Sequence, residues 1–104
     1  MKVLIIGGSG KVGTWTIPYL QKQFELKILD VNPPKDQSIE FIEGSLTDPT
    51  SIAKALDGVD VFINMVMKNP TDPFSNRATI EDVVNNYEVN TLGLHLLLYI
   101  AQSM

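Results

Sequence analysis

A short apolar run that leads through closely spaced glycines into a helical pattern is the feature that most constrains what this chain can fold into. The run Val3–Ile6 is continuously apolar, which is typical of a strand buried on both faces of a parallel sheet. After the glycines, Lys11–Lys22 repeats apolar residues at helical spacing, and Pro18 within it predicts a kink. The repeating residues are Val12, Trp15, Tyr19 and Leu20. A strand, a glycine turn and a helix in this order predict a parallel α/β unit.

The rest of the chain alternates apolar runs with helical patterns. Strands are predicted at Leu26–Leu29, Ile39–Ile42 and Val59–Ile63. Asp48-Pro49 starts a helix, because Asp accepts a hydrogen bond at the cap and Pro fits the first helical position, and Gly58 ends it. The expected buried stripe of this helix is Ile52, Ala55 and Leu56.

The last helical pattern runs from about Thr79 to the end of the sequence, after a loop at Asn64–Asn76 that contains two prolines. Its apolar residues are expected on one side, and they are Val83, Tyr87, Leu94, Leu97, Leu98 and Ala101. The predicted order is β-α-β-β-α-β-α, with right-handed helical crossovers. This order predicts a doubly wound α/β fold, with about four parallel strands in the order 3-2-1-4 and helices on both faces.

Composition narrows the classes of protein to consider. The 104 residues allow one domain, and 44% hydrophobic residues can bury a small core. With 8 Lys and Arg against 12 Asp and Glu, a basic stripe for nucleic acid is excluded. The absence of Cys and the single His exclude disulfides and Cys or His clusters, so no metal site is predicted. The sequence has neither a secretory signal pattern nor an apolar run long enough for a bilayer, so we expect a cytoplasmic protein.

The glycine turn has the composition of a phosphate-binding loop. It reads Gly7-Gly8-Ser9-Gly10-Lys11-Val12-Gly13 between the first strand and the first helix. Gly7 is expected to make a tight turn, Gly10 to let the backbone approach a pyrophosphate, and Gly13 to let the helix pack on the strand. The helix N-terminus supplies unpaired N–H groups and a partial positive charge. An ordinary strand–helix turn is the alternative, whereas a P-loop is excluded because no Gly-Lys-Ser/Thr follows at the required spacing.

Asp30 is the second candidate residue. It follows the second predicted strand, where a carboxylate can accept hydrogen bonds from both ribose hydroxyls of an adenosine. The same carboxylate would repel a 2′-phosphate, so Asp30 favours NAD over NADP as the cofactor. The alternative is an Asp that only forms the turn before Asn32-Pro33.

Four features in register resemble the NAD-dependent epimerase/dehydratase family, the extended short-chain dehydrogenases/reductases. They are KVLIIGGSGKVGT, the Asp30 position, EGSLTDPTSIAKALDGVDVFIN and YEVNTLG. The resemblance covers essentially the whole chain but only about the first third of a typical member. It implies that residues 1–104 form the N-terminal part of an NAD(P)-binding Rossmann domain, with no second domain. The activity it implies is hydride transfer by an oxidoreductase, isomerase or lyase, with a sugar or nucleotide-sugar as the expected substrate.

The resemblance also assigns cofactor contacts to individual positions. Gly7, Gly10, Gly13 and the backbone of 9–12 match the pyrophosphate loop. The Lys11 side chain within it is explained equally well by a phosphate contact or by an exposed lysine. Ser45-Leu46 matches the segment beside the adenine, where the family usually has Asp before Leu or Ile.

Two further matches lie later in the chain. Asn64–Met67 matches the end of the fourth strand beside the cofactor, where Val66 and Met67 are bulkier than the family's usual small residues. Asn90 matches an Asn near the nicotinamide ribose, although a helix Asn bonded to its own backbone is the alternative. Gly93 is expected to permit close helix packing. The candidate cofactor-binding residues are therefore Gly7, Ser9, Gly10, Lys11, Val12, Gly13, Asp30, Ser45, Leu46, Asn64, Met65, Val66 and Asn90.

The family's catalytic residues have no counterpart in this sequence. Members use a Ser or Thr and a Tyr-x-x-x-Lys pair for proton transfer. The residues four positions after the three tyrosines are Gln23, Thr91 and Ser103. We therefore expect the fifth strand and the catalytic pair to lie beyond Met104, and no turnover from the 104 residues. The alternative is a non-catalytic dinucleotide-binding or sensor module that forms homo-oligomers through the open edge of its fourth strand.

Overall fold

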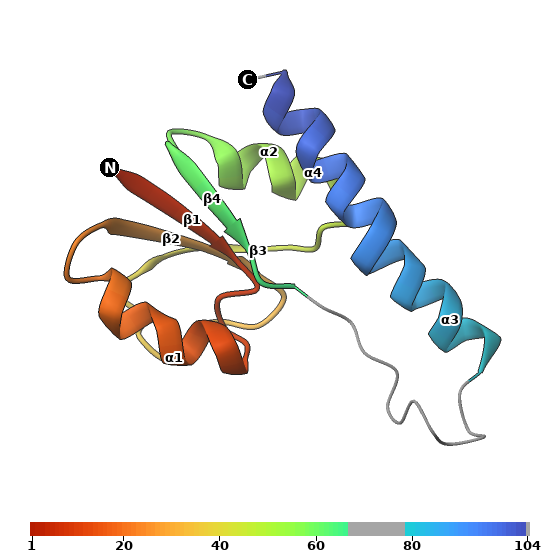
Figure 1. The fold of residues 1–104 in the computed structure, drawn as a ribbon, viewed down its shortest axis with the longest axis horizontal. Helices are drawn as coiled ribbons and strands as arrows, with labels where there is room; N and C mark the ends of the chain where they lie inside the picture. The colour runs from red at the N-terminus through yellow and green to blue at the C-terminus, as the bar shows by residue number, and fades with distance from the viewer. Residues whose placement is uncertain (67–78, 104) are drawn as a thin grey trace.

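A four-stranded parallel sheet forms the centre of the protein. The computed structural model describes residues 1–66 and 79–103. The strands are β1 (Lys2–Ile6), β2 (Glu25–Asp30), β3 (Glu40–Glu43) and β4 (Val61–Asn64). They pair in the order β3-β2-β1-β4 (Figure 1). The predicted fold class and strand order are confirmed, and the predicted strand limits lie within two residues of the observed ones.

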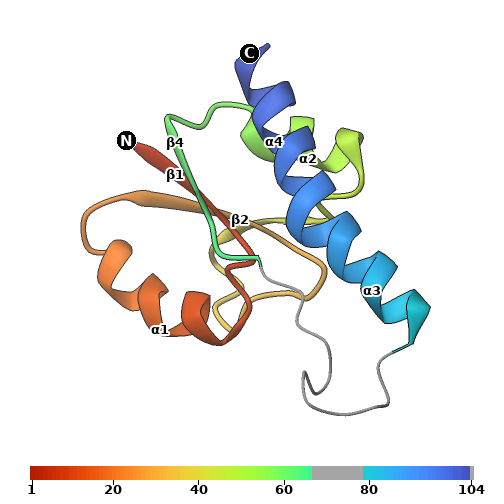
Figure 2. The same ribbon diagram turned by 45° about the vertical axis from the view of Figure 1, so that its right-hand side comes forward.

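Helices cover both faces of the sheet, as predicted. α1 (Lys11–Leu20) lies on one face, whereas α2 (Pro49–Leu56) and α4 (Gly93–Gln102) lie on the other (Figures 1 and 2). α3 (Ile80–Tyr87) and a π-helical turn, η1 (Glu88–Leu92), precede α4, and α3 extends past the sheet.

The alternation of side chains along β1 explains the two helical layers. Val3 and Ile5 are buried toward α1, and Leu4 and Ile6 are buried toward α2 and α4. Because every residue of this run is buried on one face or the other, the strand is apolar throughout rather than alternating.

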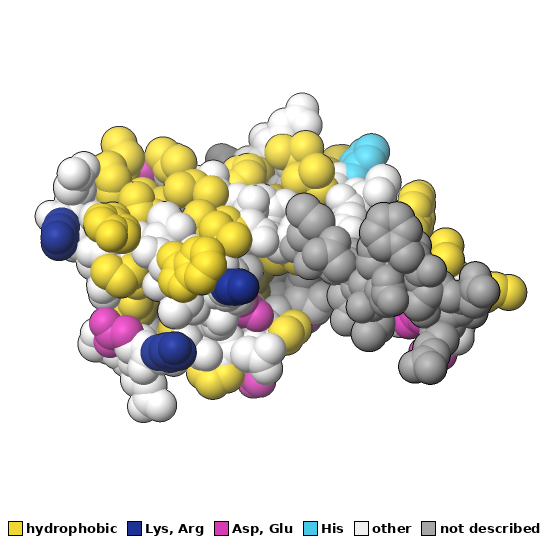
Figure 3. Space-filling view, turned by 60° about the horizontal axis from the view of Figure 1, so that its bottom comes forward, with side chains coloured by type: hydrophobic (Ala, Val, Ile, Leu, Met, Phe, Trp, Pro, Cys, Tyr) yellow, Lys and Arg dark blue, Asp and Glu magenta, His cyan; other side chains and the backbone are white. Residues whose placement is uncertain are grey.

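The apolar residues that recur at helical spacing in α1 do not mark the side of the helix that faces the sheet. Trp15 is 64% exposed and Tyr19 is 73% exposed, whereas Gly13 and Ile17 are buried. The reason is Gly13, which lies so close to the Gly8 backbone that a Cβ there would collide with it. That contact fixes the rotation of α1, so of the four recurring apolar residues only Leu20 is partly buried. Figure 3 shows hydrophobic and Lys side chains together on the face that carries α1.

The helix α2 begins and ends as predicted. Asp48 caps it by accepting a hydrogen bond from the Thr50 N–H at 3.1 Å, and Pro49 occupies the first turn. Gly58, with φ of 73°, follows the helix. The predicted buried residues Ile52, Ala55 and Leu56 pack into the core under α4.

The last helical segment is not the single amphipathic helix that was predicted. A capping box of Thr79 and Asp82 starts α3, and the π-helical turn η1 then separates it from α4. A π-helical turn interrupts the 3.6-residue period, so residues before and after it do not continue one stripe. Of the six residues predicted on one side, Leu97 is fully buried and Ala101 partly buried. The other four are exposed, and they are Val83, Tyr87, Leu94 and Leu98.

A buried lysine in β2 links three elements. Lys27 is 4% exposed, and its Nζ donates to the carbonyl oxygens of Lys54 at 2.8 Å and Asp57 at 3.2 Å, at the C-terminal end of α2. The same Nζ lies 3.3 Å from Glu40 Oε2 on β3, and Glu40 Oε1 also pairs with Lys2 Nζ at 2.7 Å. A cation at a helix C-terminus is electrostatically favourable, so Lys27 holds α2 against the sheet.

Two predictions touch segments that the structure describes only in part. The predicted loop at Asn64–Asn76 and the bulky residue Met67 lie mostly or wholly in 67–78, outside the described residues. Within 1–66 and 79–103, every helix is too short or too polar to cross a membrane.

Candidate functional site

The glycine turn is hydrogen-bonded to the end of β2 and lies close to the residues that follow β4. Gly7 has φ of 80°, and its N–H donates to the Leu29 carbonyl oxygen at 2.8 Å. A Cβ at Gly7 would lie 2.9 Å from Val66 Cγ2. Both the positive φ and this close approach require glycine, which confirms the predicted tight turn.

The start of α1 faces open space. Gly10 is the N-cap residue, with extended backbone and no side-chain cap. The first N–H groups of any helix lack an intrahelical acceptor, and here they follow an exposed glycine. A Cβ at Gly10 would meet only the Gly7 carbonyl oxygen, at 3.3 Å. A side chain at this position needs that carbonyl oxygen to move by a few tenths of an ångström, and the rest of the space in front of the helix is left for an anion.

Asp30 connects the end of β2 to this turn. Its Oδ2 accepts a hydrogen bond from the Ser9 N–H at 3.0 Å. Its Oδ1 accepts from the N–H groups of Val31 at 2.6 Å and Asn32 at 3.2 Å. A carboxylate offers about four acceptor positions, so about one, on Oδ2, remains for a ligand hydroxyl. Asp30 thus forms the local turn and also presents an acceptor beside the glycine turn.

The Ser9 side chain adds an unusual polar atom at the same place. Its Oγ is buried and, within the described part of the chain, has no hydrogen-bond partner. Buried hydroxyls in folded proteins are nearly always bonded to protein, to ordered water or to a ligand, so this turn has room for one more polar partner.

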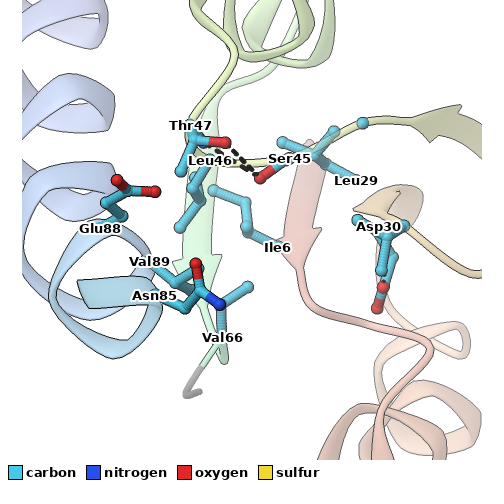
Figure 4. Close-up of a pocket in the computed structure, with 12 residues that line it drawn as sticks. Ile6, Leu29, Asp30, Ser45, Leu46, Thr47, Val66, Asn85, Glu88 and Val89 are labelled. Atoms are coloured by element: carbon cyan, nitrogen blue, oxygen red, sulfur yellow. Dashed lines mark hydrogen bonds between the residues drawn. The ribbon is translucent and has the colours of Figure 1, made fainter. Parts of the chain in front are cut away.

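A pocket of about 350 Å³ opens beside Asp30 at the carboxyl ends of β1, β2 and β3 (Figure 4). Of the predicted residues, it brings together Asp30, Ser45, Leu46 and Val66. It is also lined by residues that the sequence analysis did not select: Ile6, Leu29, Val31, Gly44, Thr47, Asn85, Glu88 and Val89. Helical spacing places positions 85, 88 and 89 on one face, but it does not show that this face meets the pocket.

Ser45 and Thr47 form a small hydroxyl pair at the edge of the pocket. Their side-chain oxygens are 2.9 Å apart, and Ser45 Oγ also accepts from the Thr47 N–H at 3.1 Å (Figure 4). Leu46 between them is buried and belongs to the core under α4. The segment after β3 therefore contributes an apolar floor and two uncharged polar groups.

The remaining predicted residues lie around or away from the pocket. Asn64 Oδ1 accepts from the Val66 N–H at 3.0 Å, which shapes the end of β4. Met65 packs against the core on the α1 side. Lys11 Nζ lies 5.2 Å from the centre of the Trp15 ring, and Val12 of the same turn is exposed.

Asn90 is placed differently from the other predicted residues. It lines a separate cavity of about 440 Å³ along α4, together with His95 and Tyr99. The structure therefore does not bring Asn90 into the pocket beside Asp30. Gly93, by contrast, lies against Leu46, as a residue needed for close helix packing should.

The residues at this edge of the sheet fit a dinucleotide. The start of α1 offers N–H donors for a diphosphate, and the Ser9 hydroxyl lies buried without a partner beside it, among the described residues. Asp30 offers an acceptor for a ribose hydroxyl. The pocket beyond Asp30 has the size of small-ligand sites and is walled largely by apolar residues.

Comparison with known proteins identifies the family. A model of the NAD dependent epimerase/dehydratase family matches residues 3–100 of the chain. The chain belongs to this family. The match includes the glycine turn, Asp30 and Asn90, and it confirms the resemblance found in the sequence. For the family as a whole, NAD is the cofactor on which activity depends.

Solved structures share the fold of this family member. A short-chain dehydrogenase/reductase superfamily protein from Agrobacterium tumefaciens, with bound NAD, is 24% identical with a TM-score of 0.84, and the match covers 99% of this chain and 29% of that one. UDP-glucose 4-epimerase from Thermus thermophilus, in complex with NAD, is 23% identical with a TM-score of 0.79, and the match covers 99% of this chain and 34% of that one.

A curated relative is similar over a shorter region. The uncharacterized protein y4nG of Sinorhizobium fredii is 31% identical over 70 residues, which cover 64% of this chain and 18% of that protein. The matched regions therefore span about a third or less of each of these three proteins.

Proposed function

We propose that this chain binds NAD at the carboxyl edge of its sheet and supplies the cofactor-binding part of an epimerase, dehydratase or dehydrogenase. The hydrogen bond from the Ser9 N–H to Asp30 Oδ2, at 3.0 Å, carries this proposal. It joins the ribose acceptor directly to the turn that presents the helix N–H groups. The adenosine then occupies the pocket, and the diphosphate lies at residues 9–13.

NAD is the proposed cofactor in preference to NADP. The free acceptor position of Asp30 suits a ribose hydroxyl, whereas a 2′-phosphate would bring negative charge against the carboxylate. The pocket lining contains no Lys or Arg among the described residues that could pair with such a phosphate.

For the reaction, we propose hydride transfer on a sugar or nucleotide-sugar in the complete enzyme. Bound NAD would supply the hydride acceptor, and this chain would hold its adenosine and diphosphate. The similarity in fold to UDP-glucose 4-epimerase supports a sugar-nucleotide substrate. Because the sequence lacks Tyr-x-x-x-Lys, the 104 residues alone are expected to bind cofactor without turnover. We retain the cytoplasm as the expected compartment.

Replacing Gly10 by Val tests the proposed diphosphate position. Extended backbone at Gly10 suits valine, and the added Cβ meets only one carbonyl oxygen, so the variant should stay folded. The side chain would fill the space in front of α1 and abolish NAD binding in calorimetric titration. Ala53→Val is the matched control, because it adds a branched apolar side chain at an exposed position on α2. Undiminished NAD binding by a folded Gly10→Val protein would refute the proposed position.

A further inference from the structure

The pocket beside Asp30 has two chemically different ends. Figure 4 shows Asp30 on one side and Asn85 with Glu88 on the opposite side, with apolar side chains such as Ile6 and Leu46 between them. A nucleoside held by its ribose at Asp30 would therefore direct the edge of its base toward the helical wall. The polar groups of that wall decide which base fits.

Glu88 differs from the other polar groups near that wall. Ser45 and Thr47 are already bonded to each other, and the Asn85 amide can both donate and accept, so these groups suit several bases. The Glu88 carboxylate, when ionised, only accepts hydrogen bonds. It is partly buried, and no ion pair or hydrogen bond of its side chain occurs among the described residues.

The packing of the helix fixes the position of Glu88. Gly93 lies against Leu46, and the Glu88 carbonyl oxygen lies 3.2 Å from the place of a Gly93 Cβ. Glu88 begins the π-helical turn, a feature often found at functional sites. The close approach of this turn to Leu46 brings the Glu88 side chain to the pocket wall.

Building on the proposed NAD site, we propose that Glu88 selects adenine by accepting a hydrogen bond from its exocyclic amine. A carboxylate accepting from an N–H makes a strong, charge-assisted hydrogen bond in a partly buried site. A purine base that lacks this amine offers no donor to the carboxylate at that position. Glu88 is thus a specificity-determining residue at the base end of the pocket, as Asp30 is at the ribose end.

The test compares NAD with the analogue in which purine replaces adenine, so that only the exocyclic amine is missing, in calorimetric titrations of the 104-residue chain. We expect the wild-type protein to bind NAD about 10-fold more tightly, which corresponds to about 1.4 kcal/mol, because the analogue cannot make the charge-assisted hydrogen bond. Glu88→Gln keeps the size of the side chain but removes its charge, so the preference should fall to about 2-fold or less. Glu81→Gln is the control, because it removes the same charge from an exposed position in the first turn of α3, and it should leave the preference unchanged.

The outcomes separate this proposal from the function on which it rests. Equal binding of both dinucleotides by the wild-type protein would overturn the role of Glu88 and leave the NAD site standing. An unchanged preference in a folded Glu88→Gln protein would overturn it as well. Failure of a folded wild-type chain to bind either dinucleotide would overturn the proposed function and the role of Glu88 together.

Discussion

Gly93 of α4 lies directly against Leu46, so that a Cβ on Gly93 would come within 2.8 Å of the Leu46 Cβ. Leu46 follows β3 and forms the floor of the pocket beside Asp30, while the turn before Gly93 forms its far wall. Because Gly93 has no side chain, the helix can approach Leu46, and this approach sets the distance between the floor of the pocket and its far wall. If the pocket binds the cofactor as proposed, stability and cofactor binding are coupled at this contact.

Gly93→Val is expected to disturb both properties. The larger side chain must displace Leu46, and overpacking of this kind costs about 1–3 kcal/mol of unfolding free energy. Because the helix moves away from the pocket, NAD binding should weaken beyond the loss of stability. Urea denaturation and calorimetric titration measure the two effects. Thr91→Val is the control, at an exposed position in η1, and it should leave the unfolding free energy and the NAD affinity near their wild-type values. A Gly93→Val protein as stable as the wild-type protein would contradict the packing argument.

Asp30→Asn is expected to narrow the preference for NAD over NADP. The amide nitrogen cannot accept the ribose hydroxyl or the Ser9 N–H, so NAD should bind more weakly, by about 1–3 kcal/mol for a hydrogen bond to a charged group. NADP should lose less, because the negative charge facing its 2′-phosphate is removed. Calorimetric titration with each dinucleotide gives the ratio of the NAD affinity to the NADP affinity. If the substitution only disrupted the turn, both affinities would fall equally and this ratio would not change.

Lys27→Met is expected to destabilise the fold by about 1–3 kcal/mol, because it leaves the α2 carbonyl oxygens and Glu40 without the buried ammonium group. Thermal or urea unfolding monitored by circular dichroism measures the change. Lys54→Met removes an exposed lysine from α2 and should change stability little. Equal losses of stability from the two substitutions would show that the contacts of Lys27 with the α2 carbonyl oxygens and Glu40 do not stabilise the fold.

The acid sensitivity of the fold should depend on Glu40. A hydrogen bond from Lys2 holds the pKa of the Glu40 carboxyl below its ordinary value of 4.5, with Lys27 adding to this effect against partial desolvation. A carboxyl whose pKa is lower in the folded state stabilises the fold above its unfolded pKa, and this contribution is lost as the pH falls through the folded pKa. Unfolding free energy measured from pH 6 to pH 3 should therefore decline less steeply in Glu40→Gln than in the wild-type protein. Parallel declines would contradict this.

Sequence patterns predicted the sheet well because its signal is local. The continuously apolar Val3–Ile6 run, the glycine turn and the Asp48-Pro49 start each encode backbone structure within a few residues. The rotation of α1 was not predictable in this way. Trp15 and Tyr19 repeat at helical spacing, yet the contact between Gly13 and Gly8 decides which side of the helix meets the sheet.

In the candidate site, too, sequence patterns predicted some residues and missed others. Asp30, Ser45 and Leu46 follow strands of a parallel sheet, so topology alone predicts that they lie together. Asn85 and Glu88 reach the pocket only because Gly93 seats the helix on Leu46 and a π-helical turn interrupts its period. No local pattern specifies that insertion. The predicted apolar face of the last helix was also wrong at Leu94 and Leu98, which lie within α4 on its exposed side.

The most direct test of the account is calorimetric titration of the purified wild-type chain with NAD and, separately, with NADP. The account predicts that NAD binds with a clear preference over NADP, because Asp30 offers its acceptor beside the start of α1. A chain that is folded by circular dichroism but binds neither dinucleotide, or binds NADP as tightly as NAD, would contradict it.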